Sequence, residues 1–313
     1  MRRSFRPAMF ERAVPGVDRP LTGALLMILS VFLFATMDML VKLAAEHHPI
    51  GQIIFFRNIV AFLPLSFFIL QAGGISVLRT RRLGGHLLRS CFGLAAMVCF
   101  FISYKLLPLG EAVALGMVGP LFITALSVPL LAEKVGIRRW SAVIVGFVGV
   151  LVMTRPGSGI FDPAALIPLV GAFFLALAMI MIRRLAHSEH SATIVFYFTV
   201  TATLASAASL PWQWATPDLA GIVLLVSIGL IGGVAQFAMT QAFRQAPAAL
   251  VAPLEYLALV FAMLYGLWIW REYPDLFLGI GAAIVVAAGL YILHRETVLA
   301  RARGRASRVA KGP

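Results

Sequence analysis

The residues best suited to chemistry in this chain are charged side chains inside otherwise apolar segments. Asp38 and Lys42 are four residues apart, so a helix would place both on one face. Arg57 lies in the next apolar segment, and a guanidinium can hold a carboxylate through two parallel hydrogen bonds. Because an unpaired charge near the centre of a bilayer costs about 2.5–3.5 kcal/mol, we expect these side chains to pair with each other or to line water.

Two interpretations of these three charges stay open at the level of sequence. In the first, they form the charged lining of a cavity mouth, a gate, or a binding point for an anionic group of a ligand. In the second, Asp38 and Lys42 belong to an interhelical ion-pair lock that fixes the first two helices together.

A second pair of charges, Arg89 and Glu255, lies in different halves of the chain at comparable depth from the same membrane side. If their helices face one cavity, the two side chains are expected to pair across it and to separate during a conformational cycle, or Glu255 carries a coupling proton. Alternatively, Arg89 extends to the nearby lipid headgroups. Asn58, Gln236 and Tyr256 are further candidates to line a cavity, although a lone polar side chain in a span more often forms an interhelical hydrogen bond.

Catalytic and metal-binding patterns are missing from the sequence. We find no nucleophile elbow, no phosphate-binding P-loop and no HExxH zinc motif. The two cysteines, Cys91 and Cys99, fit no zinc or redox spacing. We therefore predict no catalytic residue, no metal site, no cofactor and no enzymatic activity.

The elements that must position these residues are apolar segments of membrane-spanning length. Hydrophobic residues make up 61% of the chain and charged residues only 12%, against about a quarter in soluble domains. Lipid cannot satisfy an open backbone, so each segment must be a helix, and the fold class is an all-α membrane protein. The net charge of +13 falls in loops and tails, which argues against a nucleic-acid partner. The ten predicted spans are 21–45, 50–71, 84–107, 110–132, 137–155, 164–182, 191–210, 218–242, 247–270 and 273–293.

The distribution of Lys and Arg predicts the orientation of these spans. The loops on the N-terminal side contain Arg79, Arg81, Arg82, Lys134, Arg138, Arg139, Arg183, Arg184 and Arg244. The opposite side contains only Lys105, Arg155 and Arg271. The positive-inside rule therefore predicts a multi-pass inner-membrane protein with both termini in the cytoplasm.

The spans form two related halves of five, which must then be inverted relative to each other. In each half, an apolar span ends in a glutamate, Glu133 or Glu272, and a short loop leads to a span rich in small residues. We expect a tail at 1–20, a first repeat at 21–155, a second at 156–293 and a basic tail at 294–313. Pro120 and Pro253 are expected to kink their spans. The glycines Gly229, Gly232 and Gly233 indicate either close helix packing or a bend.

Three short runs resemble a known family of membrane proteins. They are FATMDMLVK from Phe34 to Lys42, QIIFFRN from Gln52 to Asn58, and APLEY from Ala252 to Tyr256. Together with the paired spans, these runs make residues 21 to 293 similar to the EamA-type transporters of the drug/metabolite transporter superfamily. The resemblance implies ten helices in two inverted repeats around a central cavity. It also implies secondary transport of a small organic metabolite by alternating access, and the family's substrates include riboflavin, S-adenosylmethionine, amino acids and carnitine derivatives.

Two other functions remain as alternatives: an intramembrane lipid-modifying enzyme and a passive channel. A lipid-modifying enzyme is expected to group several His or Asp residues at one interface, and this sequence does not. A channel is usually assembled from subunits with few helices, whereas an inverted repeat of ten spans favours a self-contained carrier. The expected partners are a small-molecule substrate and membrane lipids, with a coupling proton and a homodimer left open.

Overall fold

The computed structural model describes residues 20–131, 135–155, 162–186, 188–246 and 248–309. Within these ranges every regular element is helical, and the helices supply ten spans long and apolar enough to cross a membrane, as predicted. The elements of the first half are α1 (Pro20–Ala44), α2 (Ile50–Ala72), η1 (Ile75–Leu78), α3 (Leu83–Leu106), α4 (Leu109–Gly116), α5 (Gly119–Leu131) and α6 (Ile137–Thr154). Those of the second half are η2 (Pro163–Ala165), α7 (Leu166–Leu185), α8 (Ser191–Ser209), α9 (Leu219–Gln245), α10 (Ala248–Val251), η3 (Ala252–Tyr256), α11 (Leu257–Tyr265), η4 (Gly266–Trp270) and α12 (Leu276–Val309).

Proline interrupts the fourth and ninth spans at the predicted places. The fourth span breaks between α4 and α5, immediately before Pro120, and the ninth changes from α10 to the 3₁₀ turn η3, which contains Pro253. A proline removes one backbone hydrogen bond and clashes with the preceding turn, which accounts for both breaks. The two broken helices occupy equivalent positions in the two halves, as in carriers whose binding sites lie at interrupted helices.

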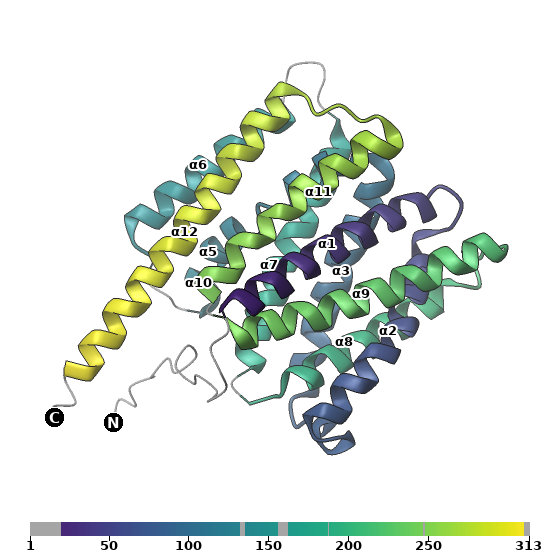
Figure 1. The fold of residues 1–313 in the computed structure, drawn as a ribbon, viewed down its shortest axis with the longest axis horizontal. Coiled ribbons are helices and arrows are strands. Elements are labelled where there is room, and N and C mark those ends of the chain that lie inside the picture. Colours follow the sequence, from purple (N-terminus) through teal and green to yellow (C-terminus); the bar gives the residue numbers. More distant parts are fainter. Residues whose placement is uncertain (1–19, 132–134, 156–161, 187, 247, 310–313) are drawn as a thin grey trace.

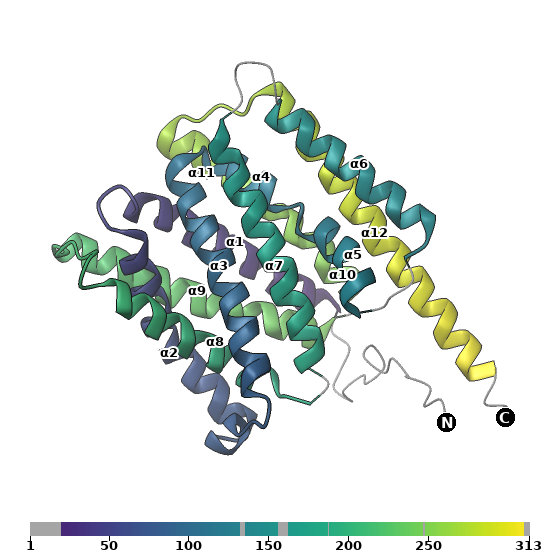
Figure 2. The same cartoon turned by 180° about the vertical axis from the view of Figure 1, so that it is seen from behind.

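Helices that are equivalent in the two halves make equivalent packing contacts. Helix α1 packs along α9, and the equivalent helices α7 and α3 pack along each other in the same way. The equivalent pair α2 and α8 also make contact, as do α6 and α12 at the edge of the bundle (Figures 1 and 2). Helix α1 begins and α12 finishes at the same end of the bundle, which we call the terminal end; the opposite end is the distal end (Figure 1).

Small residues allow the closest of these helix contacts. A Cβ added to Gly149 would lie 2.8 Å from the carbonyl oxygen of Gly281, so α6 and α12 approach backbone to backbone. A Cβ added to Gly229 would lie 2.5 Å from Val60, and one added to Gly233 would lie 2.2 Å from Pro64. Helix α9 runs without a break through its glycines. Gly229 and Gly233 serve the packing of α2, and Gly232 faces Met37 of α1.

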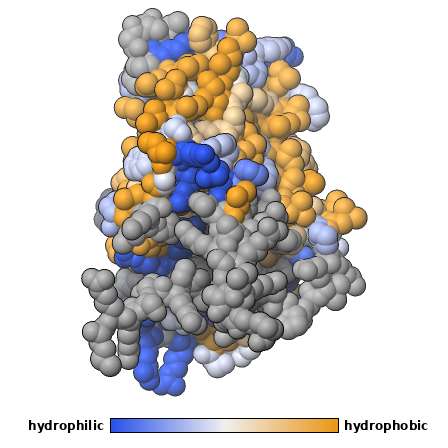
Figure 3. Space-filling model, turned by 90° about the vertical axis from the view of Figure 1, so that its left-hand side faces the viewer, coloured by the Kyte–Doolittle hydropathy of each residue, from blue (hydrophilic) through white to orange (hydrophobic). Residues whose placement is uncertain are grey.

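The outer surface of the bundle is apolar. Large hydrophobic side chains such as Leu25, Leu63 and Leu204 are exposed on it, and Figure 3 shows hydrophobic residues covering much of the upper part of one side. Surfaces of this kind are stable when lipid covers them. Helix α12 continues beyond the predicted end of its span at residue 293, because the Ala, Leu and Arg that follow are strong helix formers. The repeat glutamate Glu133 lies outside the described residues.

Candidate functional site

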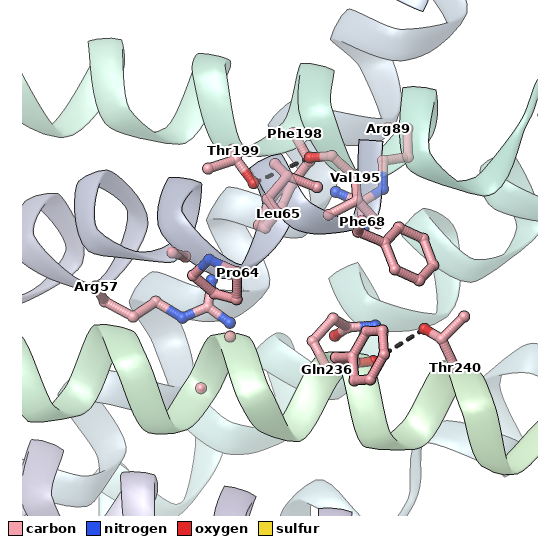
Figure 4. A pocket seen from close by; sticks show the side chains of 14 residues that line it. Arg57, Pro64, Leu65, Phe68, Arg89, Val195, Phe198, Thr199, Gln236 and Thr240 are labelled. Atoms are coloured by element: carbon pink, nitrogen blue, oxygen red, sulfur yellow. Dashed lines mark hydrogen bonds between the residues drawn. The ribbon is translucent and has the colours of Figure 1, made fainter. Parts of the chain in front are cut away.

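A cavity of about 100 Å³ lies between helices of both halves. Arg57 of α2 and Arg89 of α3 reach it from the first half, and Gln236 of α9 reaches it from the second (Figure 4). We call it the central cavity. Its lining is completed by Ala61, Pro64, Leu65, Phe68, Val195, Phe198, Thr199, Gly232, Gly233, Phe237 and Thr240. Three of the predicted site residues are therefore brought together by helices that are far apart in the sequence.

Arg57 is positioned by its neighbour Asn58. The Nη1 atom of Arg57 donates a hydrogen bond to Oδ1 of Asn58 at 3.2 Å, and Nδ2 of Asn58 donates to the carbonyl oxygen of Ile54 at 2.8 Å. Asn58 is fully buried, so this arrangement fixes its side chain. Asn58 therefore supports the site from behind and does not line the cavity.

Arg89 lies against an aromatic ring and has no acidic partner among the residues that the structure describes. Its Cζ atom is 4.1 Å from the centre of the Phe198 ring, a cation–π contact. Its Nε and Nη1 atoms are buried without a hydrogen-bond partner among the described residues. The ion pair with Glu255 is not formed in this structure: Glu255 is exposed on η3 and forms no ion pair in the part of the chain that is described, so a pair that forms in another state of the cycle stays a prediction. In this structure Arg89 lines the central cavity and its guanidinium lies on the Phe198 ring, which is the cavity position and not the headgroup position of the two alternatives.

Tyr256 faces away from the central cavity. A Cβ added to Gly289 of α12 would lie 1.8 Å from the Tyr256 hydroxyl oxygen, so this ring packs directly on the backbone of α12. The 3₁₀ turn η3 sets this direction, because its side chains follow a tighter spacing than those of an α-helix. The break in the ninth span thus removes Glu255 and Tyr256 from the group that the sequence pattern suggested.

Asp38 and Lys42 do not pair with each other, and Lys42 takes no part in a lock between the first two helices, because its ion pair is with Glu272 of the second half. Asp38 is hydrogen-bonded to Tyr104 of α3 and lies within the electrostatic influence of Arg57. Lys42 instead places its Nζ atom 2.5 Å from Oε1 of Glu272 and 2.7 Å from the carbonyl oxygen of Leu107. At the end of α1, the long side chain of Lys42 reaches a carboxylate and a backbone carbonyl at the same time. Asp38, four residues away, would provide only the carboxylate.

These contacts of Lys42 form part of a cluster at the distal end. Oε2 of Glu272 accepts a hydrogen bond from the backbone N–H of Leu109 at 2.8 Å. We call Lys42, Glu272 and the backbone of Leu107 and Leu109 the distal clamp. Glu272 belongs to the second half and the other members to the first, so the distal clamp ties the halves together.

The sequence pattern did not connect Lys42 with Glu272. In the sequence, Glu272 marked only the end of a repeated span, and Asp38 was the acidic residue nearest to Lys42 on its own helix. A lysine inside an apolar span requires an anionic partner, and in the structure this partner is Glu272. The ring of Trp270 supports the distal clamp, with Lys42 Nζ 5.0 Å from its centre, and its Nε1 atom donates to Glu46 Oε1 at 3.0 Å.

Comparison with known proteins places this architecture in a family. The sequence profile described as the EamA-like transporter family matches residues 21–155 and again residues 163–294. The chain belongs to the EamA-like transporter family. The first match ends after α6 and the second begins at η2. The residues that line the central cavity of this EamA-family protein come from both matched segments.

Curated relatives of this EamA-family chain are transporters of different compounds. It is 30% identical to the pseudopaline exporter CntI of Pseudomonas aeruginosa over 90% of this chain and 97% of that protein. It is 29% identical to the riboflavin transporter of Vibrio cholerae, over 90% and 96% of the two chains. It is 28% identical to the S-adenosylmethionine uptake transporter of Rickettsia bellii, over 86% and 92%.

A solved crystal structure shares the fold with a TM-score of 0.61 at 20% identity, and the match covers 90% of this chain and 99% of the other. The family match and the curated relatives identify the chain as a multi-span membrane transporter.

Proposed function

We propose that this EamA-family protein is a secondary transporter of the inner membrane that moves a small organic metabolite through the central cavity by alternating access. The observation that carries the proposal is the position of Arg57, Arg89 and Gln236, which line one cavity between the two halves. Sites at the interface of inverted repeats are exposed to either side when the halves rock against each other.

The dimensions of the central cavity support a conformational cycle. Its volume of about 100 Å³ is smaller than the roughly 300–1,000 Å³ typical of small-molecule sites. A metabolite therefore requires the halves to separate around it. The distal clamp ties these halves at one end, which fits a state closed on the distal side.

The breaks in the fourth and ninth spans supply the places where such a movement is absorbed. Each break lacks part of the helical hydrogen-bond ladder at a proline, so it bends at lower cost than a continuous helix. The two breaks belong to equivalent spans, so both halves can bend at the same place during the movement.

The orientation proposed is that the terminal end faces the cytoplasm. Arg79, Arg81 and Arg82 lie in the connection between α2 and α3 at the terminal end, and the positive-inside rule assigns such loops to the cytoplasm. Fusion of a reporter active only in the periplasm after Gln213, in the distal connection between α8 and α9, should give activity. The same reporter fused after Arg81 should give none, and the reverse result would overturn the orientation.

Energy for the cycle is proposed to come from a proton gradient, with Glu255 as the proton-carrying group. The sequence contains no ATP-binding P-loop, and Glu255 is an acidic side chain of the broken ninth span without an ion-pair partner among the described residues. Glu255→Gln should abolish substrate movement driven by an imposed pH gradient while exchange of substrate across the membrane continues. Unchanged gradient-driven movement would exclude Glu255.

The central test uses purified protein reconstituted into lipid vesicles and supplied with a metabolite extract of bacterial cells. Compounds that accumulate with the wild-type protein, as detected by mass spectrometry, should fail to accumulate with Arg57→Ala. Arg81→Ala removes the same charge from an exposed loop and should behave as the wild type. Equal accumulation by Arg57→Ala would remove the central cavity from the transport path.

A further inference from the structure

We infer that the transported compound carries a carboxylate, held by Arg57 and Arg89, on an apolar or aromatic body. This inference rests on the proposed function and specifies the substrate class of the same site. It is carried by the arrangement of charges and rings in the central cavity.

The first step is that both guanidinium groups have unused hydrogen-bonding capacity. Arg57 makes one hydrogen bond, from Nη1 to Asn58, although a guanidinium offers five N–H donors. Arg89 makes none within the described residues, and its Nε and Nη1 atoms are buried. Buried donors without partners are costly, so the site is incomplete until an acceptor enters it.

The second step is the balance of charge around the central cavity. Arg57 and Arg89 are close enough to repel each other, and Asp38 is the acidic side chain whose charge acts on Arg57. Arg89 has no ion-pair partner among the residues that the structure describes. Two positive charges therefore face one negative charge, and one further anionic group would neutralise the site.

The third step is the shape of the remaining lining. The rings of Phe68 and Phe237 pack edge to face with centroids 5.8 Å apart, and Phe198 lies beneath Arg89. This apolar surface beside two planar cations fits an aromatic or aliphatic body that ends in a carboxylate. A carboxylate is itself planar and matches the fork of an arginine through two parallel bonds.

The other polar groups that line the central cavity are suited to a second, uncharged group of the substrate. The hydroxyls of Thr199 and Thr240 donate to backbone carbonyls within their own helices, which leaves their oxygens as acceptors. The side-chain amide of Gln236 makes no hydrogen bond within the described part of the chain, so it offers both donors and an acceptor. Figure 4 shows Gln236 and Thr240 on α9, across the cavity from Arg89.

An anionic oxygen group also occurs on the phosphate of a lipid headgroup, and the experiment separates the two sources. The full-length protein is purified in detergent and its lipid content is measured by native mass spectrometry. Binding of benzoate and phenylacetate is then compared with binding of the neutral amides benzamide and phenylacetamide, and with inorganic phosphate. Thermal unfolding and calorimetry supply the readouts.

The carboxylates should bind more tightly than their matched amides. Arg89→Gln should weaken carboxylate binding by about 10- to 100-fold, because it removes one hydrogen-bonded charge pair, and should leave amide binding unchanged. Arg89→Lys keeps the charge and guards against a folding defect, and it should retain part of the preference. Arg81→Gln is the matched control on the surface. Equal binding of acids and amides, tighter binding of phosphate, or a retained phospholipid that carboxylates do not displace would each overturn the inference.

The vesicle assay separates failure of this inference from failure of the proposed function. Accumulated compounds should be carboxylates. Accumulation of only neutral or cationic compounds would overturn the substrate class while leaving the transporter function intact. No accumulation, together with selective carboxylate binding in detergent, would overturn transport through the site and leave the anion site standing.

Discussion

The Nζ atom of Lys42 lies 2.5 Å from Oε1 of Glu272, and this ion pair joins the end of α1 to the second residue after Trp270, where η4 ends. The two side chains are only 10% and 20% exposed. Each side chain also forms a hydrogen bond with the backbone beside Pro108. Lys42 donates to the carbonyl oxygen of Leu107, and Glu272 accepts from the N–H of Leu109. The distal clamp thus connects the two halves of the protein through one ion pair, Lys42 to Glu272, and one backbone hydrogen bond, Leu109 to Glu272.

Removing one charge of the distal clamp should destabilise the fold. Lys42→Met keeps the length of the side chain but leaves Glu272 unpaired in a mostly buried site, which typically costs about 3–5 kcal/mol. Thermal unfolding in detergent measures the change. Asp275→Asn is the matched control, because its ion pair with Arg155 is more exposed and such pairs contribute about 0–1 kcal/mol. Equal losses from the two variants would show that the distal clamp contributes no more than a surface pair.

Opening of the distal clamp should expose the central cavity to the distal side. Ala61 lines the cavity on α2, so Ala61→Cys provides a small reporter thiol in a chain whose own Cys91 and Cys99 are replaced. Labelling of Ala61→Cys by a membrane-impermeant maleimide from the distal side should be slow with Lys42 present and faster in Lys42→Met. Labelling at the same rate in both would mean that the clamp does not control access.

Asp38 should compete with the substrate for Arg57. Its charge acts on Arg57 while its carboxylate is held by Tyr104, so Asp38→Asn removes an internal competitor for the guanidinium. We expect Asp38→Asn to tighten benzoate binding by on the order of 1 kcal/mol, in calorimetry on the purified protein. Tyr104→Phe removes only the hydrogen bond and should have a smaller effect. Weaker benzoate binding in Asp38→Asn would indicate that Asp38 orients Arg57 and does not compete for it.

The glycines of α9 should tolerate no side chain where α2 crosses them. A Cβ at Gly233 would lie 2.2 Å from Cγ of Pro64, a rigid ring that cannot move aside, so Gly233→Ala should cost about 1–3 kcal/mol through overpacking. Gly279 of α12 has nothing within 4 Å of such a Cβ, and Gly279→Ala should leave the unfolding temperature unchanged or raise it. A similar loss at both positions would refute close packing as the reason for the α9 glycines.

The number and type of the elements were predictable from sequence, because lipid imposes one rule on every residue. Each of the ten apolar segments became a spanning helix, since no other structure satisfies its backbone. The interruptions at Pro120 and Pro253 were predictable for an equally local reason, the missing N–H of proline. The interpretation of Gly233 as a packing residue required only its size.

The partners of the charged residues were not predictable in the same way. Asp38 and Lys42 share a helix face, yet one contacts Tyr104 and the other Glu272, because residues from α3 and from beyond η4 lie closer than the other charge does. Counting residues along the spans predicts a similar depth for Arg89 and Glu255, yet Glu255 lies on the 3₁₀ turn η3 and the two form no ion pair among the described residues. Depth follows from counting residues along a helix, whereas direction depends on the rotation of that helix against its neighbours.

By itself, the sequence determined that this protein is a bundle of ten spanning helices in two related halves, through hydrophobicity, backbone satisfaction and proline. Only the tertiary structure decided that Arg57 and Arg89 share one cavity with Gln236, and that Lys42 is bound by Glu272. The physical reason is that an ion pair requires contact within a few ångströms. Such contact between spans depends on how every helix is rotated and packed, which no local pattern in the chain records.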